Sequence, residues 1–100
     1  MIVTIKQVMD IFAELAEKII KEQENIIGPL ALEQAKKVPG IKVDGSTHTI
    51  SLIGNKTTVL ENLVKQYEAL FGQASVELCK DVASKYLKEI PQEQLPQVLR

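Results

Sequence analysis

The chain has 100 residues, with 12 basic and 13 acidic side chains and 45% apolar residues, which fits one small domain around a single core. A formal net charge of −1 argues against broad electrostatic binding to nucleic acid or acidic lipid, because both require clustered Lys and Arg. The only cysteine, Cys79, and the only histidine, His48, exclude a disulfide framework and a structural zinc site.

Signals for export or membrane insertion are not found in the sequence. The first ten residues contain no apolar segment followed by a small-residue cleavage site. No stretch approaches the roughly 20 apolar residues that a membrane span needs. We therefore expect a cytoplasmic protein that makes no contact with a membrane.

The first third of the chain predicts two helices joined by a sharp turn. A capping-box pattern begins at Thr4, and apolar residues then recur at helical spacing as far as Ile27, with polar Gln23 as the one interruption. Gly28 can adopt the left-handed conformation that ends a helix, and Pro29 suits the first turn of the next helix. The second helix is expected to end at about residue 38.

A change of period predicts a β-hairpin at about residues 41–53. Apolar and polar residues alternate there around a cluster of turn residues. A four-residue loop would place Val43 opposite His48 and Ile41 opposite Ile50, so that these four side chains share one face. An isolated hairpin is marginal in water, so this face should pack on the helices or on a second copy of itself.

The rest of the chain predicts a second pair of helices. Another capping box begins at Thr58, and its apolar stripe continues to Gly72. A fourth helix is expected at about residues 73–89. Pro91 and Pro96 then interrupt the tail, which leaves room for at most a short helical turn.

The two helix pairs resemble each other when the sequence is shifted by 44 residues. Residues 15–38 then align with 59–82, and seven positions are identical. The common apolar rhythm of amphipathic helices explains the apolar matches, but it does not explain why Gly28 and Gly72 fall at the same phase. We therefore predict an internal duplication of one helix-Gly-helix unit.

The fold class that follows is α+β, mainly α. Two helix-Gly-helix units, about 4–38 and 58–89, flank the hairpin in a single domain of residues 1–100. The structural junctions of this domain are Gly28, Pro29 and Gly72.

The first helix is expected to begin about ten residues earlier than its counterpart. Glu14 occupies the position equivalent to Thr58, so residues 1–14, nine of which are apolar, have no match in the second unit. The shorter second pair leaves little to cover them, and a large exposed apolar patch is uncommon on a monomer. We therefore predict a homodimer whose interface contains Ile5, Val8, Met9 and Phe12.

No constellation of residues predicts catalysis. The spacing of His48 and Cys79 does not support a nucleophile with its base. Cys79 lies on the apolar stripe of the fourth helix and aligns with Ala35, as a small core residue would. We therefore predict no enzyme activity, no cofactor and no metal. An enzyme would require these two side chains and a repeat carboxylate, Glu33 or Glu77, around one pocket.

Two alternatives remain open from the sequence. A short helix-Gly-helix unit also suits a helix-turn-helix, in which Gln73, Ala74 and Ser75 would face DNA bases. The first half of that recognition helix has no Lys or Arg, which makes nucleic acid an improbable partner. A small apolar ligand between the helix pairs is the other alternative, because helical bundles often hold such sites.

The first junction carries a resemblance to a known class. Ile26-Ile27-Gly28-Pro29-Leu30-Ala31, followed by an amphipathic helix, resembles a helical segment of small modules appended to bacterial signalling proteins, among them kinases and response regulators. The resemblance implies a role in protein interaction and transfers no functional residue. Together these features predict a non-catalytic, homodimeric protein-interaction or sensing module.

Overall fold

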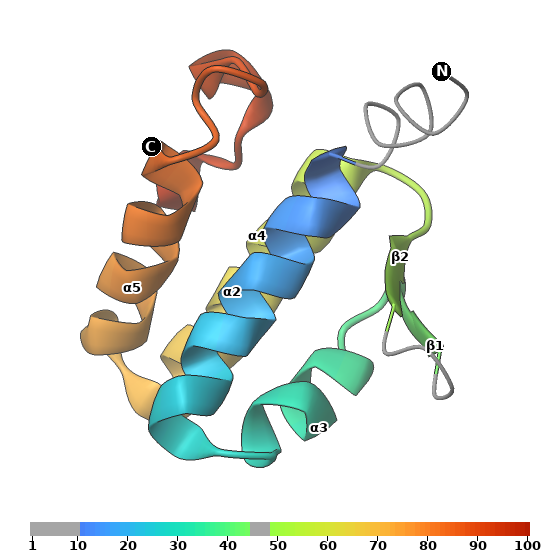
Figure 1. Cartoon of the computed structure of the whole chain (residues 1–100), viewed down its shortest axis with the longest axis vertical. Coiled ribbons are helices and arrows are strands. Elements are labelled where there is room, and N and C mark those ends of the chain that lie inside the picture. Colours follow the sequence, from blue (N-terminus) through green and yellow to red (C-terminus); the bar gives the residue numbers. More distant parts are fainter. Residues whose placement is uncertain (1–10, 45–48) are drawn as a thin grey trace.

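A computed structural model of the chain describes residues 11–44 and 49–100. The α+β, mainly α class is confirmed: two pairs of helices are separated in the sequence by a two-stranded antiparallel hairpin, which lies at one side of the helices in the structure (Figure 1). In chain order the elements are α2 (Ile11–Ile27), α3 (Leu30–Lys36), β1 (Ile41–Asp44), β2 (Thr49–Leu52), α4 (Lys56–Phe71), α5 (Gln73–Ser84) and the 3-10 turns η1 (Gln92–Gln94) and η2 (Gln97–Leu99). None of the helices in these described ranges is long and apolar enough to cross a membrane.

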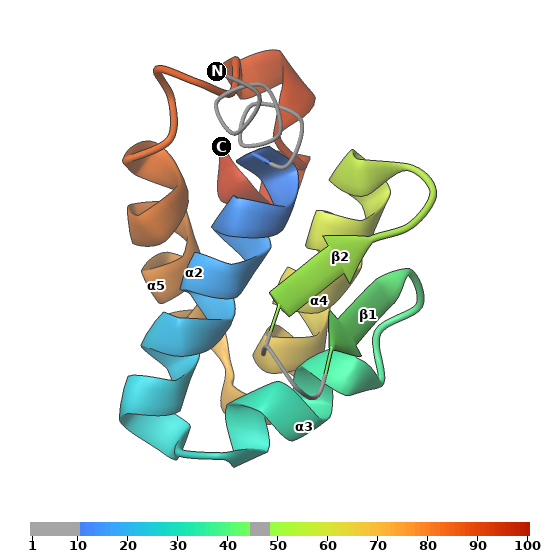
Figure 2. The same ribbon diagram turned by 45° about the vertical axis from the view of Figure 1, so that its right-hand side comes forward.

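The two long helices form the centre of the molecule. α2 and α4 run in the same direction, and each packs against both of the short helices α3 and α5 (Figures 1 and 2). The hairpin covers one side of this arrangement, where β2 contacts α2 and β1 follows α3. Both helix-to-helix junctions therefore lie at the same end of the molecule, the lower end of both views.

Each junction consists of a glycine in the left-handed region. Gly28 has a φ of +72° and its amide donates to the carbonyl of Glu24 at 2.9 Å, while Gly72 has a φ of +81° and donates to Glu68 at 2.8 Å. Both amides close the last turn of a long helix. Pro29, with a φ of −58°, then occupies the N-cap of α3, where a missing N–H costs nothing.

Two helix boundaries differ from the sequence-based prediction. The predicted cap at Thr58 is wrong, because α4 begins at Lys56 and its N-cap is Asn55, whose Oδ1 accepts from the Thr58 amide at 3.0 Å. The extended backbone of Asn55 lets its short side chain reach that amide, so the N-cap lies three residues before the predicted one. The fourth helix ends at Ser84 rather than about residue 89, because the chain turns there and buries Ile90, which is 1% exposed.

The hairpin register is also corrected. Val43 pairs with Ile50 and Ile41 with Leu52, so the predicted pairing of Val43 with His48 is wrong by two residues. A shift of two keeps every side chain on its expected face, and it places apolar side chains opposite one another. All four pack on or against the core. His48 itself lies outside the described residues.

A close backbone approach fixes how the hairpin joins α4. Gly40 has a φ of +91°, and a Cβ at this position would lie 2.5 Å from Cγ2 of Val59 and 2.9 Å from the carbonyl oxygen of Ile53. The Gly40 carbonyl also accepts from the Ile53 amide at 2.8 Å. Only glycine fits this contact without a shift of backbone or side chain.

Equivalent positions of the two helix pairs make reciprocal hydrogen bonds. Gln23 donates through Nε2 to the carbonyl of Ser75 at 3.3 Å, and Tyr67 donates through Oη to the carbonyl of Ala31 at 2.7 Å. Gln23 and Tyr67 are 44 residues apart, and so are Ala31 and Ser75. All four residues are buried. The internal duplication stays a prediction, and these reciprocal bonds favour it.

Candidate functional site

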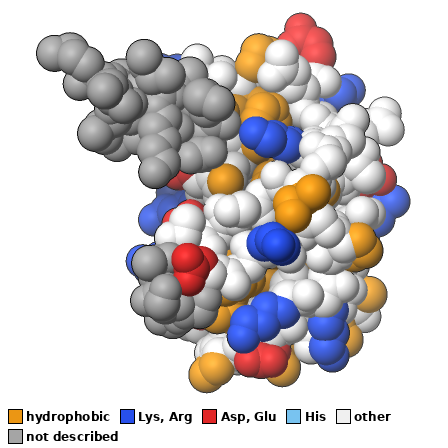
Figure 3. Space-filling view, turned by 90° about the vertical axis from the view of Figure 1, so that its right-hand side faces the viewer, with side chains coloured by type: hydrophobic (Ala, Val, Ile, Leu, Met, Phe, Trp, Pro, Cys, Tyr) orange, Lys and Arg blue, Asp and Glu red, His pale blue; other side chains and the backbone are white. Residues whose placement is uncertain are grey.

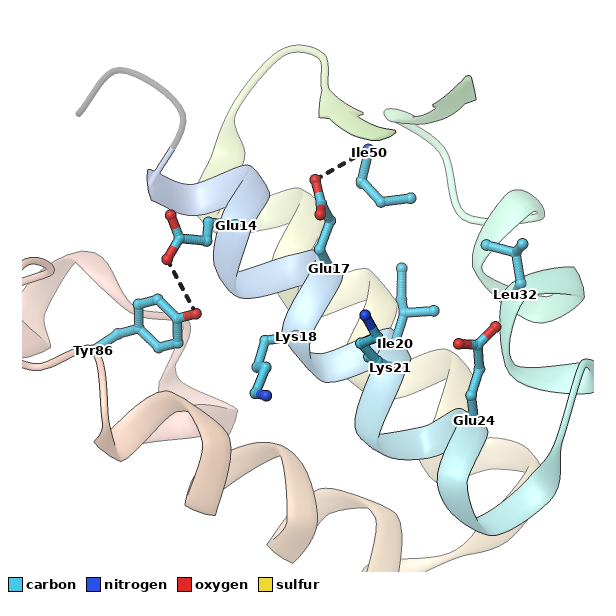
Figure 4. A pocket seen from close by; sticks show the side chains of 9 residues that line it. All are labelled: Glu14, Glu17, Lys18, Ile20, Lys21, Glu24, Leu32, Ile50 and Tyr86. Atoms are coloured by element: carbon cyan, nitrogen blue, oxygen red, sulfur yellow. Dashed lines mark hydrogen bonds between the residues drawn. The ribbon is translucent and has the colours of Figure 1, made fainter. Parts of the chain in front are cut away.

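A hollow of about 600 Å³ lies on the outer face of α2, between the hairpin, α3 and the segment after α5 (Figure 4). Its position differs from that of the predicted apolar ligand site, which would lie between the two helix pairs. It is lined by the charged side chains of Glu14, Glu17, Lys18, Lys21 and Glu24, by Ile20, Leu32 and Ile50, and by Tyr86.

Two carboxylates of this hollow are engaged by the fold. Glu17 accepts through Oε2 from the Ile50 amide at 3.3 Å, and this contact attaches the edge of the hairpin to α2. Glu14 accepts from the Tyr86 hydroxyl at 3.4 Å. Partial burial and the neighbouring Glu14 carboxylate both raise the pKa of Tyr86, so this phenol stays a hydrogen-bond donor at neutral pH.

The remaining charges of the hollow are of both signs and open to solvent. Lys18 forms an ion pair with Glu22 at 3.6 Å, with its side chain 45% exposed, and such surface pairs contribute little to stability. Carboxylates and ammonium groups above an apolar floor suit weak polar contacts with another molecule. They do not provide a nucleophile with its base, so the hollow does not define a reaction.

Cys79 is buried in the core as a neutral thiol. Its side chain is fully buried, and Sγ accepts from Nε2 of Gln23 at 3.6 Å. Burial raises the pKa of Cys79 to about 11, although the Gln23 hydrogen bond acts in the opposite direction. Because a nucleophilic cysteine needs an accessible thiolate, this position is suited to packing.

The carboxylates that an enzyme would need are distributed over the surface. Glu33 is exposed on α3 and pairs with Lys36 at 3.9 Å, while Glu77 on α5 accepts from Nε2 of Gln73 at 2.9 Å. Both carboxylates therefore lie at the surface, whereas Cys79 is fully buried. Within residues 11–44 and 49–100, no three His, Cys, Asp or Glu side chains are grouped to hold a metal ion.

The residues of the DNA-binding alternative have different environments. Ser75 is 6% exposed, and its hydroxyl donates to Oε1 of Gln23 at 3.3 Å, which removes it from any surface. Gln73 and Ala74 are exposed at the start of α5. Only Gln73 and Ala74 are therefore left for base contacts. Ala74 is a short aliphatic side chain, and the amide of Gln73 is already bonded to Glu77.

The predicted dimer interface is described only at Phe12. This side chain is half-buried and packs against the core, so only part of its ring is available to a partner. The other three predicted interface residues, Ile5, Val8 and Met9, lie outside the described residues. An interface at this end of α2 stays a prediction.

A set of exposed apolar side chains beside the junctions was not predicted from the sequence. Ile26 is 68% exposed, Leu70 is 50% exposed and Leu30 is 46% exposed. Leu70 continues the apolar stripe of α4 in the sequence, but the helix ends one residue later and leaves it at the surface. Uncharged stretches around both glycines, residues 25–32 and 69–76, were the available signal.

No protein-family model matches the chain, and neither the curated proteins nor the solved structures include a significant match. The resemblance of the first junction to modules of bacterial signalling proteins therefore stays a prediction.

Proposed function

We propose that the protein is a non-catalytic interaction or sensing module that acts as a homodimer. The observation that carries this proposal is the number of large aliphatic side chains at the surface of so small a domain. Exposed aliphatic side chains mark sites of association when they gather in one patch. The large aliphatic side chains exposed in the described part of the chain are Ile26, Leu30, Ile53, Leu70 and Leu87, each at least 46% exposed.

The buried polar groups support a structural rather than a chemical role. Gln23 bonds both Ser75 and Cys79, and among the described residues every buried side-chain nitrogen and oxygen has a partner. Satisfied polar groups of this kind fix the packing of helices. An active site more often holds a titratable group in a cleft with an unusual pKa.

Sedimentation velocity of the full chain from low to high micromolar concentration tests the proposal. We expect a monomer–dimer equilibrium, with the dimer dominant at tens of micromolar. A single monomeric species over the whole range would contradict the homodimer. Retention on duplex DNA that falls steeply with salt would favour the DNA-associated alternative, because counterion release makes such binding strongly salt-dependent.

A further inference from the structure

The last ten residues, 91–100, form a tail that turns back over the end of the molecule at which α2 and α4 begin (Figures 1 and 2). Leu95 is 1% exposed and Leu99 is 4% exposed, and both belong to the hydrophobic core. Turn η2, which contains Leu99, contacts both α4 and α5, and the Thr57 hydroxyl donates to the Gln94 carbonyl at 2.7 Å. Two buried leucines therefore anchor the tail, and we call the surface of α4 and α5 beneath it the tail site.

The tail keeps its shape through bonds within itself. The amides that close its two turns donate to carbonyls three residues earlier, all inside residues 91–100, and no backbone hydrogen bond joins the tail to the other described residues. Arg100 adds internal bonds from Nε to the Leu95 carbonyl at 3.1 Å and from Nη2 to the Glu93 carbonyl at 2.9 Å. The tail is therefore held on the helices by side chains, as a docked peptide is.

Two prolines prepare the tail for binding. Pro91 and Pro96 each precede one of the turns, with φ values of −58° and −59° and ψ values of 144° and 148°. Because the proline ring fixes φ, a released tail samples fewer conformations and loses less entropy when it binds again. Release itself breaks no backbone hydrogen bond of the described helices or of the hairpin.

The contact beneath the tail differs from the surface that the molecule exposes. On the face that carries the hairpin, hydrophobic side chains are interspersed with Lys and Arg side chains (Figure 3). The tail instead presents Leu95, Pro96 and Leu99 to the protein interior, and all three are buried. A site that accommodates this pattern suits another segment with two aliphatic side chains four residues apart.

We propose that the tail is a releasable ligand of its own chain. It leaves the tail site as one unit while the four described helices stay folded. Its release uncovers a docking surface for a partner segment that carries two aliphatic side chains at the spacing of Leu95 and Leu99. The attached tail blocks this surface, because a ligand linked to its own site competes at a high effective concentration. This inference goes beyond the proposed homodimer and does not depend on it.

The experiment measures, by fluorescence anisotropy, how tightly a labelled peptide with the sequence of residues 91–100 binds to the full chain. Leu95→Asp with Leu99→Asp is the release variant, because it places charges at the two buried anchors. Gln92→Asp with Gln97→Asp adds the same charges at exposed positions of the tail and is the matched control. We expect the release variant to bind the peptide at least about tenfold more tightly than the control and the wild type.

Three results would overturn the inference. The first is a release variant that is folded by circular dichroism and binds the peptide no better than the control does. The second is equal binding of a peptide that itself carries Leu95→Asp and Leu99→Asp, because such binding would not use the anchors. The third is a homodimer that is lost only in the release variant, because the tail would then occupy the tail site of a second copy.

Hydrogen exchange of the wild-type chain tests the release without any substitution, so it applies even if the release variant does not fold. The amides of Leu95 and Leu99 bond within the tail, and they should exchange together through one opening. We expect this exchange to be at least about tenfold faster than that of the buried amides of α4. Protection equal to that of α4 would show that the tail opens only when the helices unfold, and it would overturn the inference.

Discussion

The two helix pairs bury the same positions with different side chains. Where the first pair has Gln23 and Ala35, the second has Tyr67 and Cys79, and all four are buried. Both Gln23 and Tyr67 reach across to a carbonyl of the other pair. The position of Gln23 and Tyr67 and its hydrogen bond are therefore common to both pairs, whereas the volume of the side chain that fills it is not.

The largest loss of stability should come from truncating Tyr67, which is larger than its equivalent Gln23. Tyr67→Ala removes a fully buried ring and its hydrogen bond to Ala31, and we expect it to lower the free energy of unfolding by about 3–5 kcal/mol. Gln23→Ala leaves a smaller cavity, but it removes the partner of the Ser75 carbonyl and hydroxyl. We expect it to lower the free energy of unfolding by about 1–3 kcal/mol. Urea unfolding measures both. Equal losses would contradict the view that ring volume distinguishes the pairs.

The next largest effect is a loss of stability at high pH, which we expect from Cys79 in the second pair and not from its equivalent Ala35 in the first. Burial raises the pKa of the Cys79 thiol from 9.0 to about 11, so the folded state disfavours the thiolate. The unfolded chain loses its thiol proton first, and stability should therefore fall by up to about 2 kcal/mol as the pH rises from 9 through 11. Below pH 9 this contribution is fully present.

Cys79→Ala, which makes the two pairs identical at this position, provides the control. Its urea midpoint should decline less between pH 9 and 11 than that of the wild type. The residual decline is assigned to groups such as Tyr67, whose pKa burial also raises. An unchanged pH dependence in Cys79→Ala would show that the thiol does not contribute.

A smaller effect is expected at the two junction glycines. Gly28 and Gly72 both have positive φ values, and a Cβ at either position would meet no atom within 4 Å. Each Gly→Ala change should therefore cost about 1–2 kcal/mol through the left-handed backbone alone. Gly40→Ala serves as the contrast, because the clash with Val59 adds to the same backbone cost. Thermal unfolding that ranks Gly40→Ala as the mildest would contradict this account.

The smallest expected effect is the difference in stability cost between removing Glu17 and removing its equivalent, Glu61. Glu17 bonds the Ile50 amide, whereas Glu61 forms a surface ion pair with Lys65 at 2.8 Å. We expect Glu17→Ala to cost about 1 kcal/mol and Glu61→Ala about 0.3–0.5 kcal/mol. Raising the salt concentration should reduce only the cost of Glu61→Ala, because the Glu61–Lys65 ion pair is exposed to solvent.

Local patterns in the sequence were sufficient for the fold class. The apolar spacing up to Ile27 and the glycine after each long helix reflect forces that act within a few residues. The hairpin register was not predictable in the same way, because a loop that begins one residue later changes the pairing without changing the faces. The cap at Asn55 was missed because a second capping pattern begins three residues later.

The candidate surfaces depended on contacts between distant parts of the chain. Gln23 reads as an interruption of an apolar stripe, and nothing near it in the sequence shows that Ser75 lies opposite. The exposure of Ile26 and Leu70 likewise follows from where the helices end and which neighbours cover them. Residues 25–32 and 69–76 are nevertheless recognisable as uncharged, and that absence of charge is the part of the surface visible in the sequence.

The crosswise hydrogen bonds have a consequence for how the protein unfolds. Gln23 finds its acceptor only when α5 is in place, and Tyr67 finds its acceptor only when α3 is in place. Each helix pair supplies the acceptor for the other pair's buried donor, so separating the pairs breaks both bonds at once. We expect this mutual dependence to make the unfolding of the four helices cooperative.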